Sequence, residues 1–198
     1  MTASLIAPHF RDPVHDAQAA FRSLLKALSR PGALVPLTVP SEPPAPMCAS
    51  LAAVVLSLAD ADSAVWLDPA LDSDAVHRYL HIHTNAPRAC DPSEAVFAFV
   101  AGPTNMPRFA SFRAGEAAYP DRSTTVVIQV PALTGGPSVT LRGPGIETTA
   151  SIAPCGLPEW FWSDWMVNAS RYPLGVDIFL VADRSVIGLP RTTKVEIE

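Results

Sequence analysis

The sequence predicts a single α/β domain over residues 1–198, in which a mixed β-sheet is flanked by helices. Helical patterns come early in the chain, short β-branched and aromatic runs alternate with them in the middle, and antiparallel pairs of strands close it. This order is typical of a sheet with helices packed on its faces. A chain of this length can bury most of its unfolded surface in one core, and no linker or repeat divides it.

The first two predicted helices differ in their patterns. Residues 12–29 have Asp12 suited to the N-cap, Pro13 at the first helical position and a Ser-Arg-Pro-Gly stop. Helical spacing predicts one buried apolar stripe, formed by Val14, Ala17, Phe21, Leu24, Leu25 and Leu28. After a Pro-rich loop, residues 47–60 are apolar nearly all round, which predicts a helix buried between layers.

Strand patterns dominate the rest of the chain. Short apolar runs rich in β-branched and aromatic residues predict strands at 65–67, 96–100 and 124–130, with a helix over 72–79. Paired strands are expected at 138–146 and 148–152, a helix after Pro158, and a terminal hairpin of 176–182 with 186–190.

Composition and charge narrow the classes of function. A net charge of −5 without a basic cluster argues against nucleic acid and anionic membrane as partners. No apolar run is long enough to span a bilayer, and the N-terminus does not resemble a secretory signal. Three widely spaced cysteines suit reduced thiols, so we expect a cytoplasmic protein.

Familiar catalytic motifs are missing from the sequence. It has no GxxxxGK[ST] loop, GxSxG, HExxH or CxxC. Pyridoxal phosphate (PLP) needs a lysine beside it, and neither Lys26, on the polar face of the first helix, nor Lys194, in the tail, is well placed.

The histidines of residues 77–83 raise the question of a metal site. If residues 81–84 are extended, His81 and His83 share a face, whereas a continued helix would pair His77 with His81. One backbone does not readily serve both pairings, and a catalytic zinc usually needs three protein ligands. We therefore expect no metal, and predict that His83 is a hydrogen-bonded residue near the end of a strand.

Two short segments are candidates for binding an anion. Arg142, Gly143 and Gly145 follow a strand, and the glycines allow a ligand to approach the backbone closely. Arg191, Thr192 and Thr193 follow the last strand and offer a guanidinium and two hydroxyls to phosphate or phosphonate oxygens. The structural alternatives are an ordinary turn for the first segment and an ion pair of Arg191 with Asp177 for the second.

Residues 160–166 form the densest aromatic cluster. Trp160, Trp162 and Trp165 lie within two helical turns, together with Phe161, and cannot all face one core stripe. We expect at least one of these tryptophans at a protein interface; the alternative is a helix wedged between two layers.

Several segments in order resemble the PhnH family, a subunit of the bacterial carbon–phosphorus lyase machinery. The matching segments are FRSLLKALSRPG (21–32), LADADSAVWL (58–67), HTNAP (83–87), LRGPGI (141–146), YPLGVDIFL (172–180) and PRTTKVEI (190–197). The resemblance implies a fold similar to the large domain of PLP-dependent transferases, but without PLP. It also implies a homodimer when isolated and a core complex with PhnG, PhnI and PhnJ, which uses MgATP and a phosphonate to form ribose 1-phosphonate 5-triphosphate.

The resemblance supplies no catalytic residue, so three functions remain open. The leading one is an accessory subunit of the phosphonate-degrading complex, with no cofactor of its own. The second is a stand-alone small-molecule transferase whose anion site contains Arg142 and Arg191. The third is a metal sensor built on His77, His81 and His83. Because the sequence shows no paired base and nucleophile, the accessory subunit is favoured.

Overall fold

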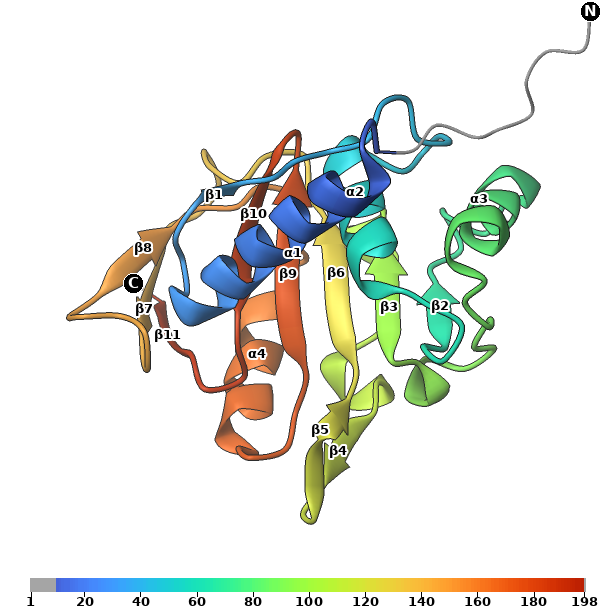
Figure 1. The fold of residues 1–198 in the computed structure, drawn as a ribbon. Helices are drawn as coiled ribbons and strands as arrows, with labels where there is room; N and C mark the ends of the chain where they lie inside the picture. Colours follow the sequence, from blue (N-terminus) through green and yellow to red (C-terminus); the bar gives the residue numbers. More distant parts are fainter. Residues whose placement is uncertain (1–9, 198) are drawn as a thin grey trace, which may run out of the picture.

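A six-stranded mixed sheet organises the computed structural model, which describes residues 10–197 (Figure 1). Its strands lie in the order β1-β10-β9-β6-β3-β2. Their bounds are β1 (Val35–Pro36), β2 (Val65–Leu67), β3 (Phe97–Val100), β6 (Thr125–Gln129), β9 (Asp177–Ala182) and β10 (Ser185–Leu189). Strands β2, β3, β6 and β9 are parallel, whereas β10 and β1 add antiparallel. The predicted mixed sheet is confirmed.

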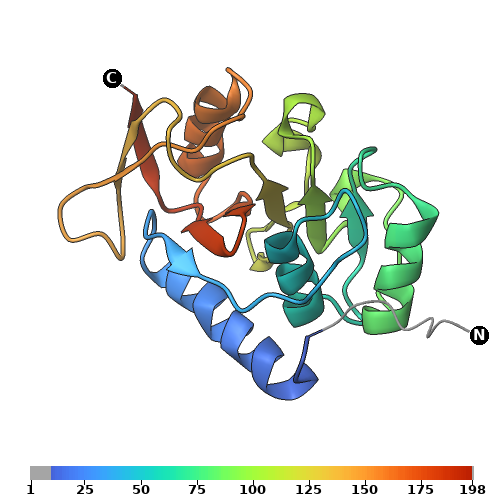
Figure 2. The ribbon, with the colours of Figure 1, turned by 90° about the horizontal axis from the view of Figure 1, so that it is seen from above.

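Side-chain alternation along these strands creates a core on each face of the sheet. Phe99, Val127 and Phe179 belong to one core, which is covered by α1 (Pro13–Ser29), α2 (Ala49–Leu58) and α3 (Asp74–Thr84). Ile128 and Leu180 belong to the other, which contains α4 (Phe161–Ser170) and the smaller strands. Figure 2 shows α1 and α2 on one side of the sheet and α4 on the other. The chain therefore folds in three layers, as the alternation of patterns predicted.

The first helix begins as predicted, but only part of the predicted stripe, Ala17, Leu24 and Leu28, packs in the core. Asp12 is the N-cap and accepts hydrogen bonds from the backbone N–H groups of Val14 and His15. The fully buried residues of α1 are Ala20, Leu24 and Ala27, whereas Val14, Phe21 and Leu25, expected in the core, are exposed. The helix packs closely on β10: a Cβ placed on Gly188 would lie 2.6 Å from the carbonyl carbon of Ala27, so the glycine is what allows α1 to approach the sheet at this distance.

The third helix is longer than predicted. It runs from Asp74 to Thr84 and ends at Asn85, whose left-handed backbone (φ 52°) donates to the Leu80 and His81 carbonyls. The expected strand at 81–84 is wrong. Asn85 is the C-cap of the helix, and the sequence pattern alone did not distinguish this C-cap from the turn after a strand. His77, His81 and His83 consequently all lie on one helix.

The rest of the fold combines predicted and unpredicted elements. β7 (Val139–Arg142) pairs antiparallel with β8 (Ala150–Ile152), as expected, and β11 (Lys194–Ile197) adds to the free side of β7. The hairpin of β9 and β10 also forms as predicted, with Asp183 at φ 49° in its turn. Unpredicted elements are β1, β11, the hairpin β4 (Ala114–Glu116) with β5 (Tyr119–Ser123), and three short turns of helix, Pro92–Glu94, Pro103–Asn105 and Phe109–Ser111. Within residues 10–197, no helix has the length and apolar character needed to cross a bilayer.

Candidate functional site

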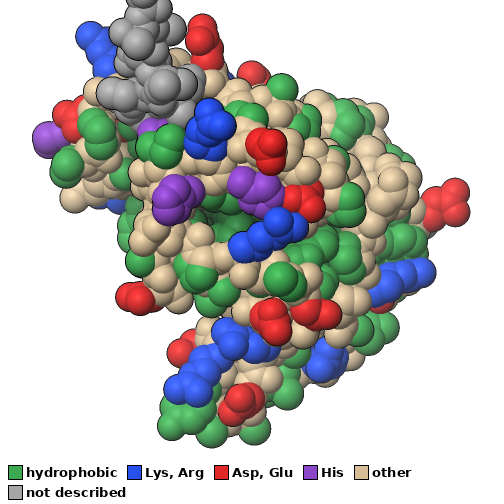
Figure 3. Space-filling view, turned by 90° about the vertical axis from the view of Figure 1, so that its right-hand side faces the viewer, with side chains coloured by type: hydrophobic (Ala, Val, Ile, Leu, Met, Phe, Trp, Pro, Cys, Tyr) green, Lys and Arg blue, Asp and Glu red, His purple; other side chains and the backbone are tan. Residues whose placement is uncertain are grey.

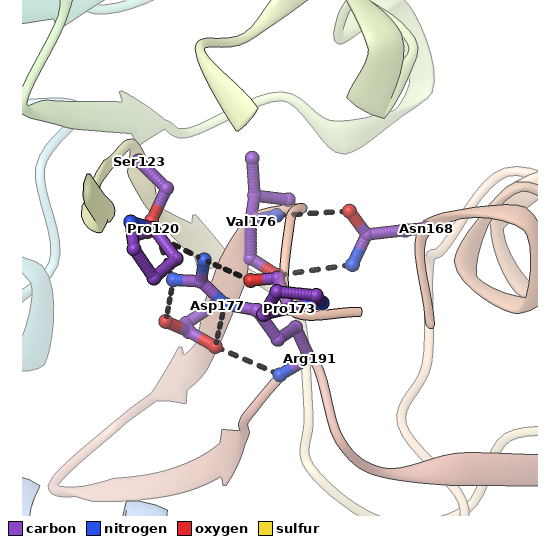
Figure 4. A network of polar contacts seen from close by, with 7 residues as sticks. All are labelled: Pro120, Ser123, Asn168, Pro173, Val176, Asp177 and Arg191. Atoms are coloured by element: carbon purple, nitrogen blue, oxygen red, sulfur yellow. Dashed lines mark hydrogen bonds and ion pairs between the residues drawn. The ribbon is translucent and has the colours of Figure 1, made fainter. Parts of the chain in front are cut away.

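Arg191 is the centre of a network that joins three separate parts of the chain (Figure 4). Its Nε donates to Asp177 Oδ1 at 3.1 Å and its Nη2 reaches Asp177 Oδ2, while its backbone N–H also donates to Oδ1 at 2.7 Å. The Nη1 group donates to the carbonyls of Pro120 at 2.9 Å and Pro173 at 3.3 Å, and Nη2 also contacts Ser123 Oγ. The guanidinium thus holds the β4–β5 hairpin and the loop after α4 against the start of β9.

This network uses the donors that a bound anion would need. The side chains of Arg191 and Asp177 are only 11% and 22% exposed. Arg191 and Thr192 do line a depression of about 270 Å³, but Asp121 and Asp177 line it as well. Of the two interpretations of the 190–193 segment, the ion pair of Arg191 with Asp177 is the one that the structure contains.

The glycine segment after β7 packs directly against the same C-terminal turn. A Cβ on Gly143 would lie 3.0 Å from the Thr192 carbonyl oxygen, and one on Gly145 would lie 2.3 Å from the Ser29 carbonyl oxygen. Gly145 also has φ +83°, a conformation that glycine adopts at little cost. The two segments expected to bind an anion are therefore neighbours, but these glycines allow close packing of the protein's own backbone.

Arg142 and Thr193 are also engaged within the protein. Arg142 Nε donates to Glu196 Oε1 at 2.9 Å across β7 and β11, and both side chains are more than half exposed. Thr193 is fully buried, and its carbonyl accepts a hydrogen bond from Trp165 Nε1 at 3.0 Å. The Thr193 hydroxyl is buried without a hydrogen-bond partner among the described residues and does not reach the surface of this chain.

His83 lies far from the two anion-segment candidates. It belongs to α3, on the opposite side of the sheet from β7 and β11 (Figures 1 and 2). Its ring packs on Tyr79, with ring centroids 4.6 Å apart, and burial raises the pKa of Tyr79 well above its usual value. The structure therefore does not assemble the predicted residues into one site.

The histidines of α3 are not arranged around a common centre for a metal. His77 Nε2 contacts Asp72 Oδ1 at 2.5 Å, and Arg88 donates to Asp72 Oδ2 at 3.0 Å. Within the part of the chain that the structure describes, no group of three or more His, Cys, Asp or Glu side chains is placed to hold a metal ion.

The tryptophans divide between core and partial exposure. Trp165 is fully buried among aromatic rings and so does not reach the surface of this chain. Its indole N–H is satisfied by Thr193, which permits burial of the whole ring. Trp160 and Trp162 are half-buried; Trp160 lies under the Arg108 guanidinium, 4.2 Å from the ring centroid. The well-exposed apolar side chains of α4 are instead Met166 and Val167.

Two polar residues at the carboxyl ends of the parallel strands were not predicted. Asp68, directly after β2, accepts backbone hydrogen bonds from Leu71, Ala101 and Gly102. Gln129, the last residue of β6, accepts from the Cys48 N–H and donates to the Pro46 carbonyl. A hollow of about 350 Å³ lies beside Gln129, at the end of an α/β sheet where ligands commonly bind. The only sequence signal for these two residues was a lone polar residue at the end of a buried strand. In the structure, the side chains of Asp68 and Gln129 both hold neighbouring loops in place.

The structure thus defines a mixed α/β protein whose candidate anion-binding arginines are paired with its own carboxylates. A family model described as bacterial phosphonate metabolism protein (PhnH) matches residues 8–196. The chain belongs to the PhnH family.

Two curated relatives extend over most of the chain. One is the alpha-D-ribose 1-methylphosphonate 5-triphosphate synthase subunit PhnH of Rhizobium meliloti (strain 1021), 43% identical over 189 residues, which cover 96% of this chain and 94% of the relative. The other is HtxG of Stutzerimonas stutzeri, named as a candidate C-P lyase subunit protein, 33% identical over 183 residues, with 91% and 86% covered.

Proposed function

We propose that this chain is a subunit of a carbon–phosphorus lyase complex in phosphonate catabolism. In this role it supports the formation of ribose 1-phosphonate 5-triphosphate from MgATP and a phosphonate. The observation that carries the proposal is the 43% identity, over nearly the full length of both chains, to a protein named as the PhnH subunit of the corresponding synthase. The partners expected from the family resemblance are PhnG, PhnI and PhnJ, in the cytoplasm, with a homodimer when the chain is isolated.

The contacts within the chain favour an accessory role over a stand-alone transferase. Arg191 and Arg142, the groups that a transferase site would use, are paired with Asp177 and Glu196. Lys26 and Lys194 are both exposed on the surface, which supports the proposal that the chain does not use PLP. We also propose that the fold resembles the large domain of PLP-dependent transferases and that the sheet of this chain serves as a scaffold.

The test combines growth and purification in a bacterium whose own copy of this gene is deleted. A tagged copy of the chain should restore growth on methylphosphonate as the sole phosphorus source and should recover the other core subunits in equal stoichiometry. Growth on phosphate is the control, because it does not require the complex. Recovery of the chain alone, together with restored growth, would overturn the subunit proposal.

A pair of matched variants examines the α4 surface as a contact with a partner. Val167 is 60% exposed on α4 and Ile82 is 49% exposed on α3, so both can be replaced with aspartate at little cost to folding. If α4 contacts a partner, Val167→Asp should reduce recovery of the other subunits and Ile82→Asp should not, since a charge buried in an interface without a partner is costly. Equal recovery with both variants would exclude this part of α4.

A further inference from the structure

A small hollow beside α3 has a composition that the proposed function does not use. It has a volume of about 180 Å³ and lies between α3, β2 and residues 86–88. Its lining residues are Val65, Leu67, His77, Leu80, His81, Ala86, Pro87 and Arg88. Figure 3 shows this side of the molecule, where histidine and Lys/Arg side chains gather around a recess with a hydrophobic floor.

Local structure places the polar groups on one rim. His77 and His81 are one helical turn apart on α3, so their side chains lie on the same face. Arg88 comes from the opposite wall, where its backbone forms a parallel bridge with Val65 at the edge of the main sheet. Arg88 Nη1 lies 3.4 Å from His77 Nε2, so these two side chains converge from two separate elements, and His81 lines the same hollow.

Asp72 positions two of these three groups. Its Oδ1 contacts His77 Nε2 at 2.5 Å, and its Oδ2 accepts from Arg88 Nη2 at 3.0 Å. One carboxylate therefore fixes an imidazole and a guanidinium together. Arg88 Nη1 contacts His77 Nε2, so among the described residues Nε is the nitrogen of this guanidinium that has no hydrogen-bond partner. His81 is exposed and has no ion pair among residues 10–197, so it can turn its ring toward the recess.

We propose that this hollow binds a small organic anion, an oxyanion attached to a short alkyl group. Arg88 and His81 supply N–H donors for the oxygens, while His77, whose Nε2 is held by Asp72, forms part of the wall; guanidinium donors suit tetrahedral and planar oxyanions. The alkyl group rests on the apolar floor formed by Val65, Leu67 and Leu80. The assignment depends on the lining of the hollow and not on membership of the complex.

Isothermal titration of the purified full-length chain with ethylphosphonate tests the proposal. Saturable binding is expected below about 20 mM. Both His81→Gln and Arg88→Gln should weaken it about tenfold, the effect of one charge-assisted hydrogen bond. Arg142→Gln, which removes an exposed arginine elsewhere, is the matched control and should leave the affinity unchanged. Absence of saturable heat, or affinities of the two variants within about twofold of the wild type, would overturn the site.

Two further measurements locate the ligand and identify its chemistry. In histidine ring NMR spectra, ethylphosphonate should shift the signals of His77 and His81 and not those of His15, which lies on α1. Inorganic phosphate lacks the alkyl group and should bind more weakly; tighter binding of phosphate would overturn the role of the apolar floor. Because His81→Gln should still recover the other subunits, failure here is distinguishable from failure of the proposed function.

Discussion

Replacing Asp177 with alanine tests whether the Arg191 network holds the fold together. The variant removes the carboxylate that accepts three N–H groups of Arg191 and leaves the guanidinium mostly buried. Removing one partner of a buried ion pair typically costs about 3–5 kcal/mol, because the remaining charge is uncompensated. Arg191 keeps its contacts with Pro120, Pro173 and Ser123, so we expect the lower part of that range.

Urea denaturation measures this cost directly. With a slope of about 2 kcal/mol/M for a chain of this size, a loss of about 3 kcal/mol lowers the unfolding midpoint by about 1.5 M. Arg142→Ala breaks an exposed pair with Glu196 and should cost no more than about 1 kcal/mol. A double replacement of Asp177 and Arg191 with leucine and methionine should recover much of the lost stability, because no unpaired charge remains. If Asp177→Ala costs as little as Arg142→Ala, the structural role assigned to Arg191 is refuted.

Three further outcomes are expected. Gly145→Ala should destabilise the chain by at least about 2 kcal/mol, because the φ of Gly145 is positive and the new Cβ would overlap a backbone oxygen at the end of α1. The control Gly102→Ala should change stability by no more than about 0.5 kcal/mol, and equal urea midpoints for the two variants would contradict the prediction. Iodoacetamide should label the exposed Cys90 before Cys48, whose pKa is raised by burial, and peptide mass spectrometry showing the reverse order would refute the assignment. The hydrogen bond from His77 lowers the pKa of Asp72 below 3.8. The stabilising contribution of the Asp72 carboxylate is therefore present above pH 3.8 and is lost as the pH falls through the folded-state pKa. The stability difference between wild type and Asp72→Asn should narrow below pH 3.8, and a wider difference in urea titrations at low pH would contradict this prediction.

Local signals in the sequence determined most of the elements. Asp12 and Pro13 mark the start of α1 because capping and the fixed φ of proline depend only on neighbouring residues. The central strands and the β9–β10 hairpin were likewise readable from β-branched runs and a turn. The family resemblance also rested on segments in order along the chain, and the PhnH match confirms it.

Tertiary structure decided the faces and the partners of these elements. How closely α1 packs on the sheet depends on Gly188, more than 150 residues further along the chain, because a side chain there would overlap the backbone at Ala27. Arg191 could have met a ligand or a carboxylate, and the choice was made by Asp177, together with the Pro120 carbonyl 71 residues away. The hollow beside α3 exists because α3 continues to Thr84 and places His77 and His81 on one face, opposite Arg88. Sequence patterns encode local conformation, whereas packing distance and pairing of charges are fixed by contacts between segments that are distant in the chain.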